Sequence, residues 1–305
     1  MRPRVAILTG PSASGKSALA IELARRWPLE IVSADATMVY RGLDIGTDKP
    51  SPAERAQAAH HLLDIVAPDE AYDVVRWVED AETAIADIIS RGRIPLVTGG
   101  TIYYLRSLTE GLPTVPAPDL RLQNDIRAEL DRAGEETLLR ELAEVSPSDA
   151  ERVAGNPKRL VRALEVLRRT NKPPSSFPRK KPRFSYAKLV LWPEREALRP
   201  KVWERARWQF ENGLVEEVRG LMQQYPFMPT AIQSIGYKEV ARYLRGEWSY
   251  EEALEADRRA VWRLIKRQYT WLRREPGDVT YLPRSGKEAI PGSLSWFSRN
   301  LLVNG

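Results

Sequence analysis

The chain has 305 residues, of which 43% are hydrophobic and 29% charged, proportions that are ordinary for a globular protein with a buried core. It contains no cysteine, which excludes disulfide bonds, thiolate metal ligands and thiol nucleophiles. No run of 18 apolar residues and no cleavable apolar leader is found, so we expect a cytoplasmic protein without a membrane span. We also expect a monomer.

The net charge of +6 is concentrated in two basic blocks. Residues 158–184 hold ten Lys or Arg and one acid, Glu165, and residues 258–274 hold seven Lys or Arg and no acid. Blocks of this kind favour a polyanionic partner such as nucleic acid. A pair of solvated helix faces is the alternative, and charge alone does not decide between the two.

The first third of the chain alternates short apolar runs with segments of helical spacing. Strands are predicted at 5–9, 30–33 and 94–98, and helices at 17–27 and 74–91. Strands that alternate with helices indicate a parallel sheet, whose ligands bind at the carboxyl ends of the strands.

The pattern changes at residues 112–118, where three prolines indicate a linker or a sharp turn. The later predicted elements are helices at 119–145 and 157–169, an exposed loop at 172–182, a strand at 188–192, helical sequence at 194–275 with a break near 225–230, and a strand at 279–282. We therefore predict an α/β core, a parallel sheet flanked by helices, from 1–118 and 185–305. A mostly helical domain is inserted at 119–184, although 195–275 could instead form much of it.

A phosphate-binding loop follows the first predicted strand. The P-loop pattern G-x-x-x-x-G-K-[ST] is matched in full by Gly10, Pro11, Ser12, Ala13, Ser14, Gly15, Lys16 and Ser17. Such a loop points backbone N–H groups and a helix dipole at a phosphate. Lys16 adds a positive charge, and Ser17 offers a hydroxyl to Mg²⁺. The core is therefore predicted to be P-loop NTPase-like, but the motif does not tell which phosphate is bound.

Acidic residues at the strand ends differ from those of an ordinary P-loop NTPase, which carries an aspartate there to order Mg²⁺. The strand that leads into residues 98–101 has no acid, whereas Asp35 follows the second strand. Parallel topology places Asp35 on the edge of the sheet that carries the P-loop. There it could be a general base, a metal partner or a turn-forming residue, and spacing leaves these roles open. Thr101 follows two glycines, which let a ligand approach the backbone closely.

Several segments together resemble the bacterial tRNA dimethylallyltransferase family. They follow one another in order from residue 10 to about 273 and comprise the P-loop, 35–50, 61–65, 99–104, 159–166, 233–239 and 267–273. The resemblance implies transfer of a dimethylallyl group from dimethylallyl diphosphate to N6 of the adenosine 3′-adjacent to the anticodon of tRNA. Mg²⁺ takes part, pyrophosphate is released, and the P-loop holds the diphosphate.

The same resemblance assigns roles to single residues. Asp35 occupies the position of the general base, and Thr101 helps to hold the exocyclic amine, so both are predicted to be catalytic. Contacts with the anticodon stem-loop are implied for Asp35, Ala36, Thr37, Met38, Thr101, Gln123, Lys158, Arg159, Leu160, Val161 and Arg162. Gln123 stands where the family pattern has a basic residue.

Three other functions are open at this point. A P-loop small-molecule kinase would explain the loop, but not the strand end without an acid or the basic blocks. A prenyltransferase that acts on a free adenine nucleotide would not need those blocks. An RNA-binding module with a vestigial P-loop would bind tRNA and form no product.

Overall fold

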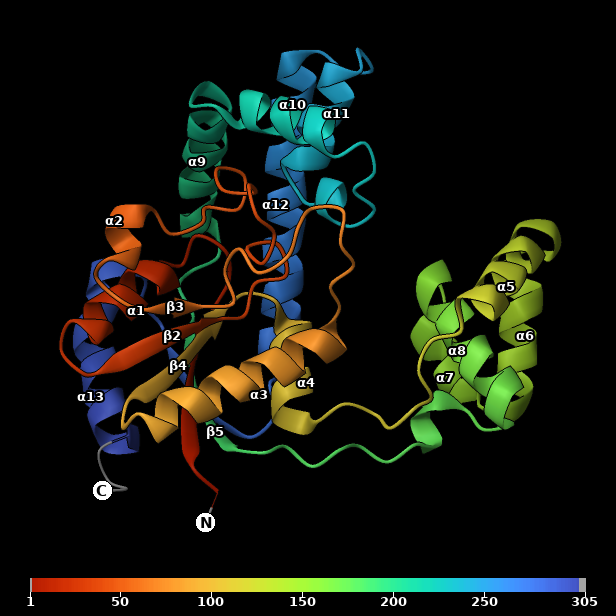
Figure 1. The fold of residues 1–305 in the computed structure, drawn as a ribbon, viewed down its shortest axis with the longest axis horizontal. Helices are drawn as coiled ribbons and strands as arrows, with labels where there is room; N and C mark the ends of the chain where they lie inside the picture. Colours follow the sequence, from red (N-terminus) through yellow and green to blue (C-terminus); the bar gives the residue numbers. More distant parts are fainter. Residues whose placement is uncertain (1, 302–305) are drawn as a thin grey trace. The chain divides into compact units, whose positions relative to one another are not determined.

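The structure is a computed structural model that describes residues 2–301, and it divides into two compact units (Figure 1). The core unit joins both ends of the chain, up to Thr109 and from Arg183 onward. The insertion unit is Glu110–Pro182, so both of its limits lie earlier than the predicted 119 and 184. Residues 195–275 belong to the core unit.

The core unit contains a parallel sheet of six strands in the order β3-β2-β4-β1-β5-β6. The strands are β1 (Arg4–Thr9), β2 (Leu29–Ser33), β3 (His60–His61), β4 (Ile94–Gly99), β5 (Ser185–Leu191) and β6 (Asp278–Leu282). The central strands are apolar along nearly their whole length because helices cover both faces of the sheet. The predicted α/β class, with strands from both ends of the chain, is confirmed.

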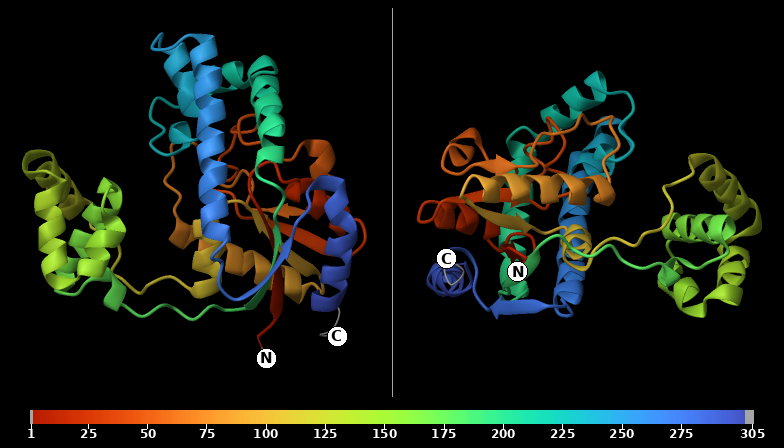
Figure 2. Two further views of the ribbon diagram at one scale, coloured as in Figure 1. Left: turned by 180° about the vertical axis from the view of Figure 1, so that it is seen from behind. Right: turned by 60° about the horizontal axis from the view of Figure 1, so that its bottom comes forward.

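Two layers of helices enclose the sheet (Figure 2). The connection from β1 to β2 through α1 (Lys16–Ala24) and that from β3 to β4 through α3 (Val74–Ser90) run in opposite directions along the sheet. Right-handed crossovers therefore place α1 and α3 on opposite faces. Trp296 and Phe297 of α13 (Ile290–Leu301) share the hydrophobic core of α1 and the strands.

The remaining helices of the core unit complete its architecture. They are α2 (Pro52–Arg55), α4 (Ile102–Glu110), α9 (Arg199–Glu211), α10 (Leu214–Gln224), α11 (Tyr237–Leu244) and α12 (Tyr250–Leu272). Short 3₁₀ turns lie at η2 (Glu196–Leu198), η3 (Ala231–Gln233) and η4 (Gly286–Ala289). The helical stretch predicted at 194–275 thus consists of four helices, and α9 packs on α12. Among residues 2–301, no helix is both long enough and apolar enough to cross a bilayer.

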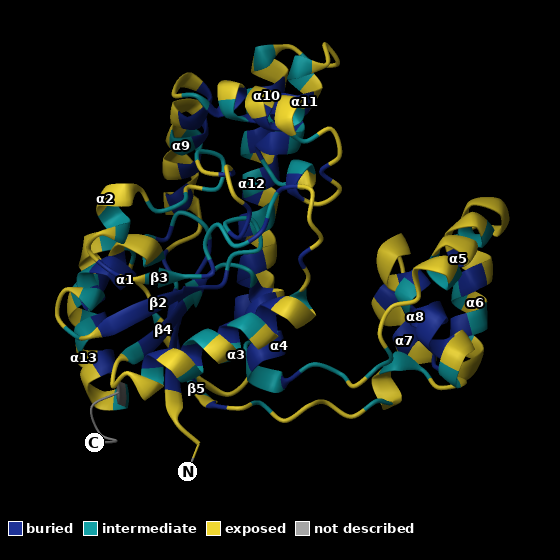
Figure 3. Ribbon diagram, viewed as in Figure 1, coloured by how far each residue is buried: buried dark blue, intermediate teal, exposed yellow. Residues whose placement is uncertain are grey.

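The insertion unit is a helical bundle with its own core. Its helices are α5 (Leu120–Ala133), α6 (Glu135–Val145), α7 (Pro147–Val153) and α8 (Pro157–Thr170), followed by η1 (Pro174–Ser176). Ile126, Leu142 and Leu164 are fully buried between these helices. Figure 3 shows this arrangement, with buried residues on the inner faces and exposed residues on the outer ones.

Candidate functional site

The P-loop joins β1 to the first turn of α1. Gly15 adopts a left-handed conformation with φ of 83°, and a Cβ added there would lie 2.8 Å from the backbone N of Gly286, so this position requires glycine. Lys16 and Ser17 begin α1, and helix geometry gives their N–H groups no intrahelical acceptor. Both N–H groups are therefore available to a phosphate at the end of the helix dipole.

Other residues of the P-loop contribute less to phosphate binding than the motif suggests. Pro11 has no N–H, and the N–H of Ser14 donates to Pro11 O at 3.2 Å. The N–H of Ser12 donates to a side chain of α12 at 2.9 Å. The Ser14 hydroxyl is buried and has no hydrogen-bond partner among the described residues. The N–H groups that can donate hydrogen bonds to a phosphate are therefore those in the part of the loop nearest to α1.

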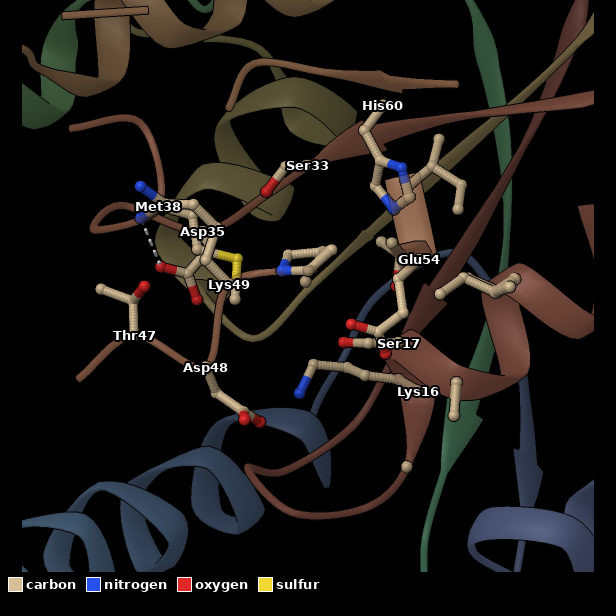
Figure 4. Close-up of a pocket in the computed structure, with 18 of the residues that line it drawn as sticks. Lys16, Ser17, Ser33, Asp35, Met38, Thr47, Asp48, Lys49, Glu54 and His60 are labelled. Atoms are coloured by element: carbon tan, nitrogen blue, oxygen red, sulfur yellow. Dashed lines mark hydrogen bonds between the residues drawn. The ribbon is translucent and has the colours of Figure 1, made fainter. Parts of the chain in front are cut away.

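A cavity of about 380 Å³ opens beside the P-loop, a size usual for small-molecule sites. Figure 4 shows Lys16 and Ser17 on one side of it, and Asp35, Met38 and Asp48 on another. The cavity therefore contains the P-loop and the strand-end acid that the sequence predicted to face it.

Lys16 is the central positive charge of this cavity. Burial lowers the pKa of its ammonium group to about 8, although Asp35 and Asp48 act in the opposite direction. The nearby Arg205 also lowers this pKa. An anionic ligand would meet a cation that is poorly hydrated, so the attraction would be stronger than at the protein surface.

Asp35 lies just after β2, and one of its two carboxylate oxygens is engaged in a turn. Oδ1 accepts hydrogen bonds from Thr37 N at 2.9 Å and from Thr37 Oγ1 at 2.6 Å. It also accepts one from Met38 N at 3.3 Å (Figure 4). The turn-forming role that spacing left open is therefore real. Oδ2 accepts none of these three hydrogen bonds, so one carboxylate oxygen is left for a ligand.

Thr101 lies beside Asp35 at the end of β4. Its N–H donates to Ala34 O at 3.2 Å, and its Oγ1 accepts a hydrogen bond from Ala36 N at 3.1 Å. A Cβ added at Gly99 would lie only 2.1 Å from Ala34 O, so the two loops approach this closely because residue 99 is glycine. The structure thus brings together the two residues predicted to be catalytic, and the Thr101 O–H can still donate to a ligand.

The loop between β2 and β3 forms one wall of the cavity and is held by an ion network around the buried Lys49. Lys49 donates to Tyr40 O at 2.8 Å and to the carboxylates of Asp44 and Asp64, each at 2.6 Å. Asp64 also accepts from Arg55 at 2.7 Å. Burial alone would raise the pKa of Asp64, but the hydrogen bonds from Lys49 and Arg55 outweigh it and hold the pKa below its ordinary value. The network therefore keeps this wall in place.

Two cationic residues of the cavity were missed in the sequence. Lys201 and Arg205 of α9 line it, and Arg205 donates to the Asp48 carboxylate at 3.1 Å. They lie one helical turn apart, a spacing that many exposed helix faces share, so only the tertiary structure reveals them. Lys201 adds its positive charge to that of Lys16, whereas the charge of Arg205 is paired with that of Asp48.

The oxygen ligands in the cavity fit Mg²⁺ that arrives with a phosphate group. No group of three or more His, Asp or Glu suited to holding a metal occurs among residues 2–301. Ser17 lines the cavity with a hydroxyl, and Mg²⁺ is usually held by one or two protein oxygens, phosphate oxygens and water. One ring nitrogen of His60 is hydrogen-bonded to Ala58 O and one of His61 to the Glu30 carboxylate, and neither His belongs to a metal-binding group among the described residues.

The structure of the insertion unit shows which of the residues of α8 predicted to contact tRNA are exposed. Leu160 and Val161 are 0% and 2% exposed within the core of the unit, so their side chains pack inward, and the predicted tRNA contacts at these two positions stay predictions. The helical period turns these two positions inward. Lys158 and Arg159 are exposed, and Arg162 is partly exposed.

Glu165 neutralises part of the first basic block. This carboxylate is fully buried and accepts hydrogen bonds from Arg162 at 2.6 Å and Arg169 at 3.0 Å. Burial raises its pKa, but the hydrogen bonds from Arg162 and Gln123 outweigh that effect, and the pKa lies below its ordinary value. Arg162 is therefore a structural ion-pair partner, and Lys158 and Arg159 are the cations left on this end of the helix.

Gln123 also has intramolecular partners. Its Nε2 donates to Glu165 Oε2 at 2.7 Å, and its Oε1 accepts from Arg127 at 3.1 Å. The side chain thus supports the buried carboxylate, and the predicted tRNA contact at Gln123 stays a prediction.

Two cations of the second basic block, Arg259 and Arg263, line a groove. A hollow of about 640 Å³ lies between α11 and α12. We call this hollow the α11–α12 groove. The cations that line it are Lys238, Arg242, Arg245, Arg259 and Arg263. Glu239 and Glu247 are the acids along the same lining, so the groove carries an excess of positive charge.

Comparisons with known proteins show the family of the chain. Residues 38–275 match the model of a protein family described as IPP transferase. A tRNA dimethylallyltransferase of Thermus thermophilus is 60% identical over 292 residues, which cover 96% of this chain and 97% of that protein. A tRNA dimethylallyltransferase of Deinococcus radiodurans is 43% identical over 296 residues, with coverage of 96% and 97%.

Solved structures that are similar to this chain are also of enzymes that act on tRNA. The full-length tRNA isopentenylpyrophosphate transferase of Bacillus halodurans has a TM-score of 0.72 at 29% identity, covering 99% of this chain and 98% of that one. A eukaryotic dimethylallyltransferase acting on tRNA has a TM-score of 0.76 at 27% identity, covering 99% and 77%.

The chain therefore belongs to the IPP transferase family. The predicted family and the predicted class of enzyme, a transferase, are confirmed. Prenylation of tRNA is the activity for which the relatives are named, and neither a small-molecule kinase nor a prenyltransferase for free nucleotides is favoured.

Proposed function

We propose that the protein transfers a dimethylallyl group from dimethylallyl diphosphate to N6 of the adenosine 3′-adjacent to the anticodon of tRNA, releasing pyrophosphate. The observation that carries this proposal is the cavity in which Lys16 and Asp35 meet. The P-loop supplies a diphosphate site, while the end of β4 lacks the acid of an ordinary NTPase. The acid after β2, Asp35, acts instead on the nucleophile.

The P-loop side of the cavity stabilises the leaving group. Negative charge grows on the diphosphate as its bond to carbon breaks, and fixed donors aimed at that charge lower the barrier. Lys16 and Lys201 supply positive charge, and the N–H groups at the start of α1 supply hydrogen bonds. Mg²⁺, held through Ser17, would neutralise further charge on the diphosphate.

The β2 side of the cavity prepares the nucleophile. An exocyclic amine attacks poorly because its lone pair is delocalised into the ring, so removal of a proton as the bond forms aids the reaction. Oδ2 of Asp35 accepts that proton, and the Thr101 hydroxyl helps to orient the amine. The adenine must leave its stack to reach them, as other bases do in enzymes that modify them.

Cations of each unit bind the tRNA. On the insertion unit these are Lys158 and Arg159, and on the core unit they line the α11–α12 groove. Phosphate contacts of this kind make RNA affinity depend steeply on salt. The protein acts as a monomer in the cytoplasm.

The replacement of Lys158 and Arg159 by alanine is expected to weaken tRNA binding and to make it less dependent on salt. Each phosphate contact that is lost lowers the slope of log K against log salt by about 1. A double alanine variant at Arg132 and Arg140 changes the charge of the same unit equally at exposed positions and serves as the control. Filter binding at several salt concentrations measures both slopes, and equal slopes in the two variants would contradict the assignment.

The product identifies the reaction directly. Protein, Mg²⁺ and dimethylallyl diphosphate are incubated with tRNA, with AMP or with neither, and the nucleosides are then examined by mass spectrometry. We expect N6-dimethylallyladenosine only from tRNA, at one position per molecule. Product from AMP and not from tRNA would overturn the proposal.

A further inference from the structure

Gln268 is a buried polar residue that connects two loops of the cavity. It belongs to α12 and is only 3% exposed. Its Oε1 accepts a hydrogen bond from Ser12 N at 2.9 Å, and its Nε2 donates to Gly100 O at 3.0 Å. One planar carboxamide thus ties the P-loop to the loop at the end of β4.

Both loops are shaped for this carboxamide. A Cβ added at Gly100 would lie 2.8 Å from Gln268 Nε2, so the amide fits against the backbone because residue 100 is glycine. The N–H of Ser12 is committed to Gln268 and is not a donor to phosphate. This contact therefore fixes the beginning of the P-loop before a ligand binds, which reduces the ordering that binding would otherwise require.

The hydrogen bond from Gln268 to Gly100 lies next to Thr101, the residue proposed to hold the reacting amine. Thr101 follows Gly100 and is bonded to Ala34 O and Ala36 N, next to Asp35. A shift of Gly100 would move the Thr101 hydroxyl, and a misplacement of about 1 Å near reacting groups can cost roughly 10²-fold in rate. Gln268 is thus connected to the diphosphate side of the cavity at one end and to the amine side at the other.

We propose that Gln268 is a positioning residue for prenyl transfer. Through Ser12 it holds the P-loop ready for the diphosphate, and through Gly100 it sets Thr101 beside Asp35. This inference rests on the proposed function of the cavity. Glutamine suits the role because one flat group offers an acceptor and a donor, whereas an ionised glutamate only accepts and a leucine does neither.

Steady-state kinetics of Gln268→Leu test the role. Dimethylallyl diphosphate is varied at saturating tRNA and Mg²⁺, and thermal unfolding is recorded for each variant. Loss of both hydrogen bonds leaves two backbone groups unpaired, and we expect kcat/KM for the donor to fall by roughly 10- to 100-fold, with KM raised and kcat lowered.

The matched control is Tyr269→Phe, at the next position of α12. It removes one buried hydrogen bond, from the Tyr269 hydroxyl to Pro193 O, which involves neither loop of the cavity, and it keeps the ring that packs in the cluster beside Ala13. We expect its kinetic constants to stay within about twofold of the wild type although its stability falls. Unchanged constants in Gln268→Leu, or an equal loss in Tyr269→Phe, would overturn the inference.

Gln268→Glu separates the two hydrogen bonds by pH, even if the leucine variant does not fold. The ionised carboxylate still accepts from Ser12 but faces the Gly100 carbonyl, whereas the protonated carboxyl group can also donate to it. Burial raises the pKa of such a group, so kcat relative to wild type should rise as pH falls from 8 to 6, with KM for the donor little changed. A ratio that does not change with pH speaks against the role. Product formation by the wild type tests the proposed function separately.

Discussion

Asp35→Asn is expected to lower kcat by about 10²–10⁴-fold and to leave tRNA affinity close to that of the wild type. Asparagine keeps an oxygen that accepts from Thr37 and Met38, so the turn after β2 is preserved. It cannot take a proton from the exocyclic amine, because an amide is not a base at neutral pH. Single-turnover rates with saturating donor and tRNA, together with filter binding, measure the two effects.

Asp35→Ala is the companion variant, because it removes the base and the turn together. If proton transfer is what Asp35 supplies, both variants are slowed to a similar extent, and only the alanine variant also loses stability. If the turn is what matters, the asparagine variant retains nearly normal turnover and only the alanine variant is slow. The second outcome would remove Asp35 from the catalytic residues and leave it as a structural residue of the cavity.

The fold was predictable where burial is continuous along a strand. The runs that became β1, β2 and β4 are apolar because both faces of the sheet are covered, and they end in glycine or in Asp35. β3 was missed because it has two residues and no apolar pattern of its own. α13 was missed because its sequence begins Ile-Pro-Gly-Ser, which is typical of a turn, and it is stabilised by packing of Trp296 and Phe297 on the sheet.

The candidate site was predictable where a local pattern carries the chemistry. The P-loop and Asp35 are short segments next to strand ends, and their contact follows from parallel topology. Arg205 lines the cavity and Gln268 contacts its loops from distant helices, and no spacing in the sequence predicts such contacts. Charge counting overstated the free cations of α8, because Arg162 and Arg169 are paired with the single acid of the block.

Lys16→Met is expected to lower kcat/KM for dimethylallyl diphosphate by about 10²–10³-fold, the usual loss when one donor to a developing negative charge is removed. Methionine keeps much of the length of the side chain, so the change is mainly one of charge. Lys287→Met is the control, because Lys287 is an exposed cation in η4, close to the P-loop and outside the lining of the cavity. Steady-state rates at saturating tRNA compare the two variants, and similar losses in both would contradict a specific role for Lys16.

The lowered pKa of Lys16 gives the same assignment a second test. With a pKa of about 8 in the free enzyme, Lys16 is charged below pH 8 and becomes neutral as pH rises through that value. A neutral amine does not attract the diphosphate, so kcat/KM for the donor, which reports on the free enzyme, should be steady below about pH 7, fall to roughly half near pH 8 and decline further above it. The bound diphosphate favours the charged form, so kcat should fall only at higher pH. The decline of kcat/KM should be absent in Lys16→Met, and an identical decline in that variant would assign the titration to another group.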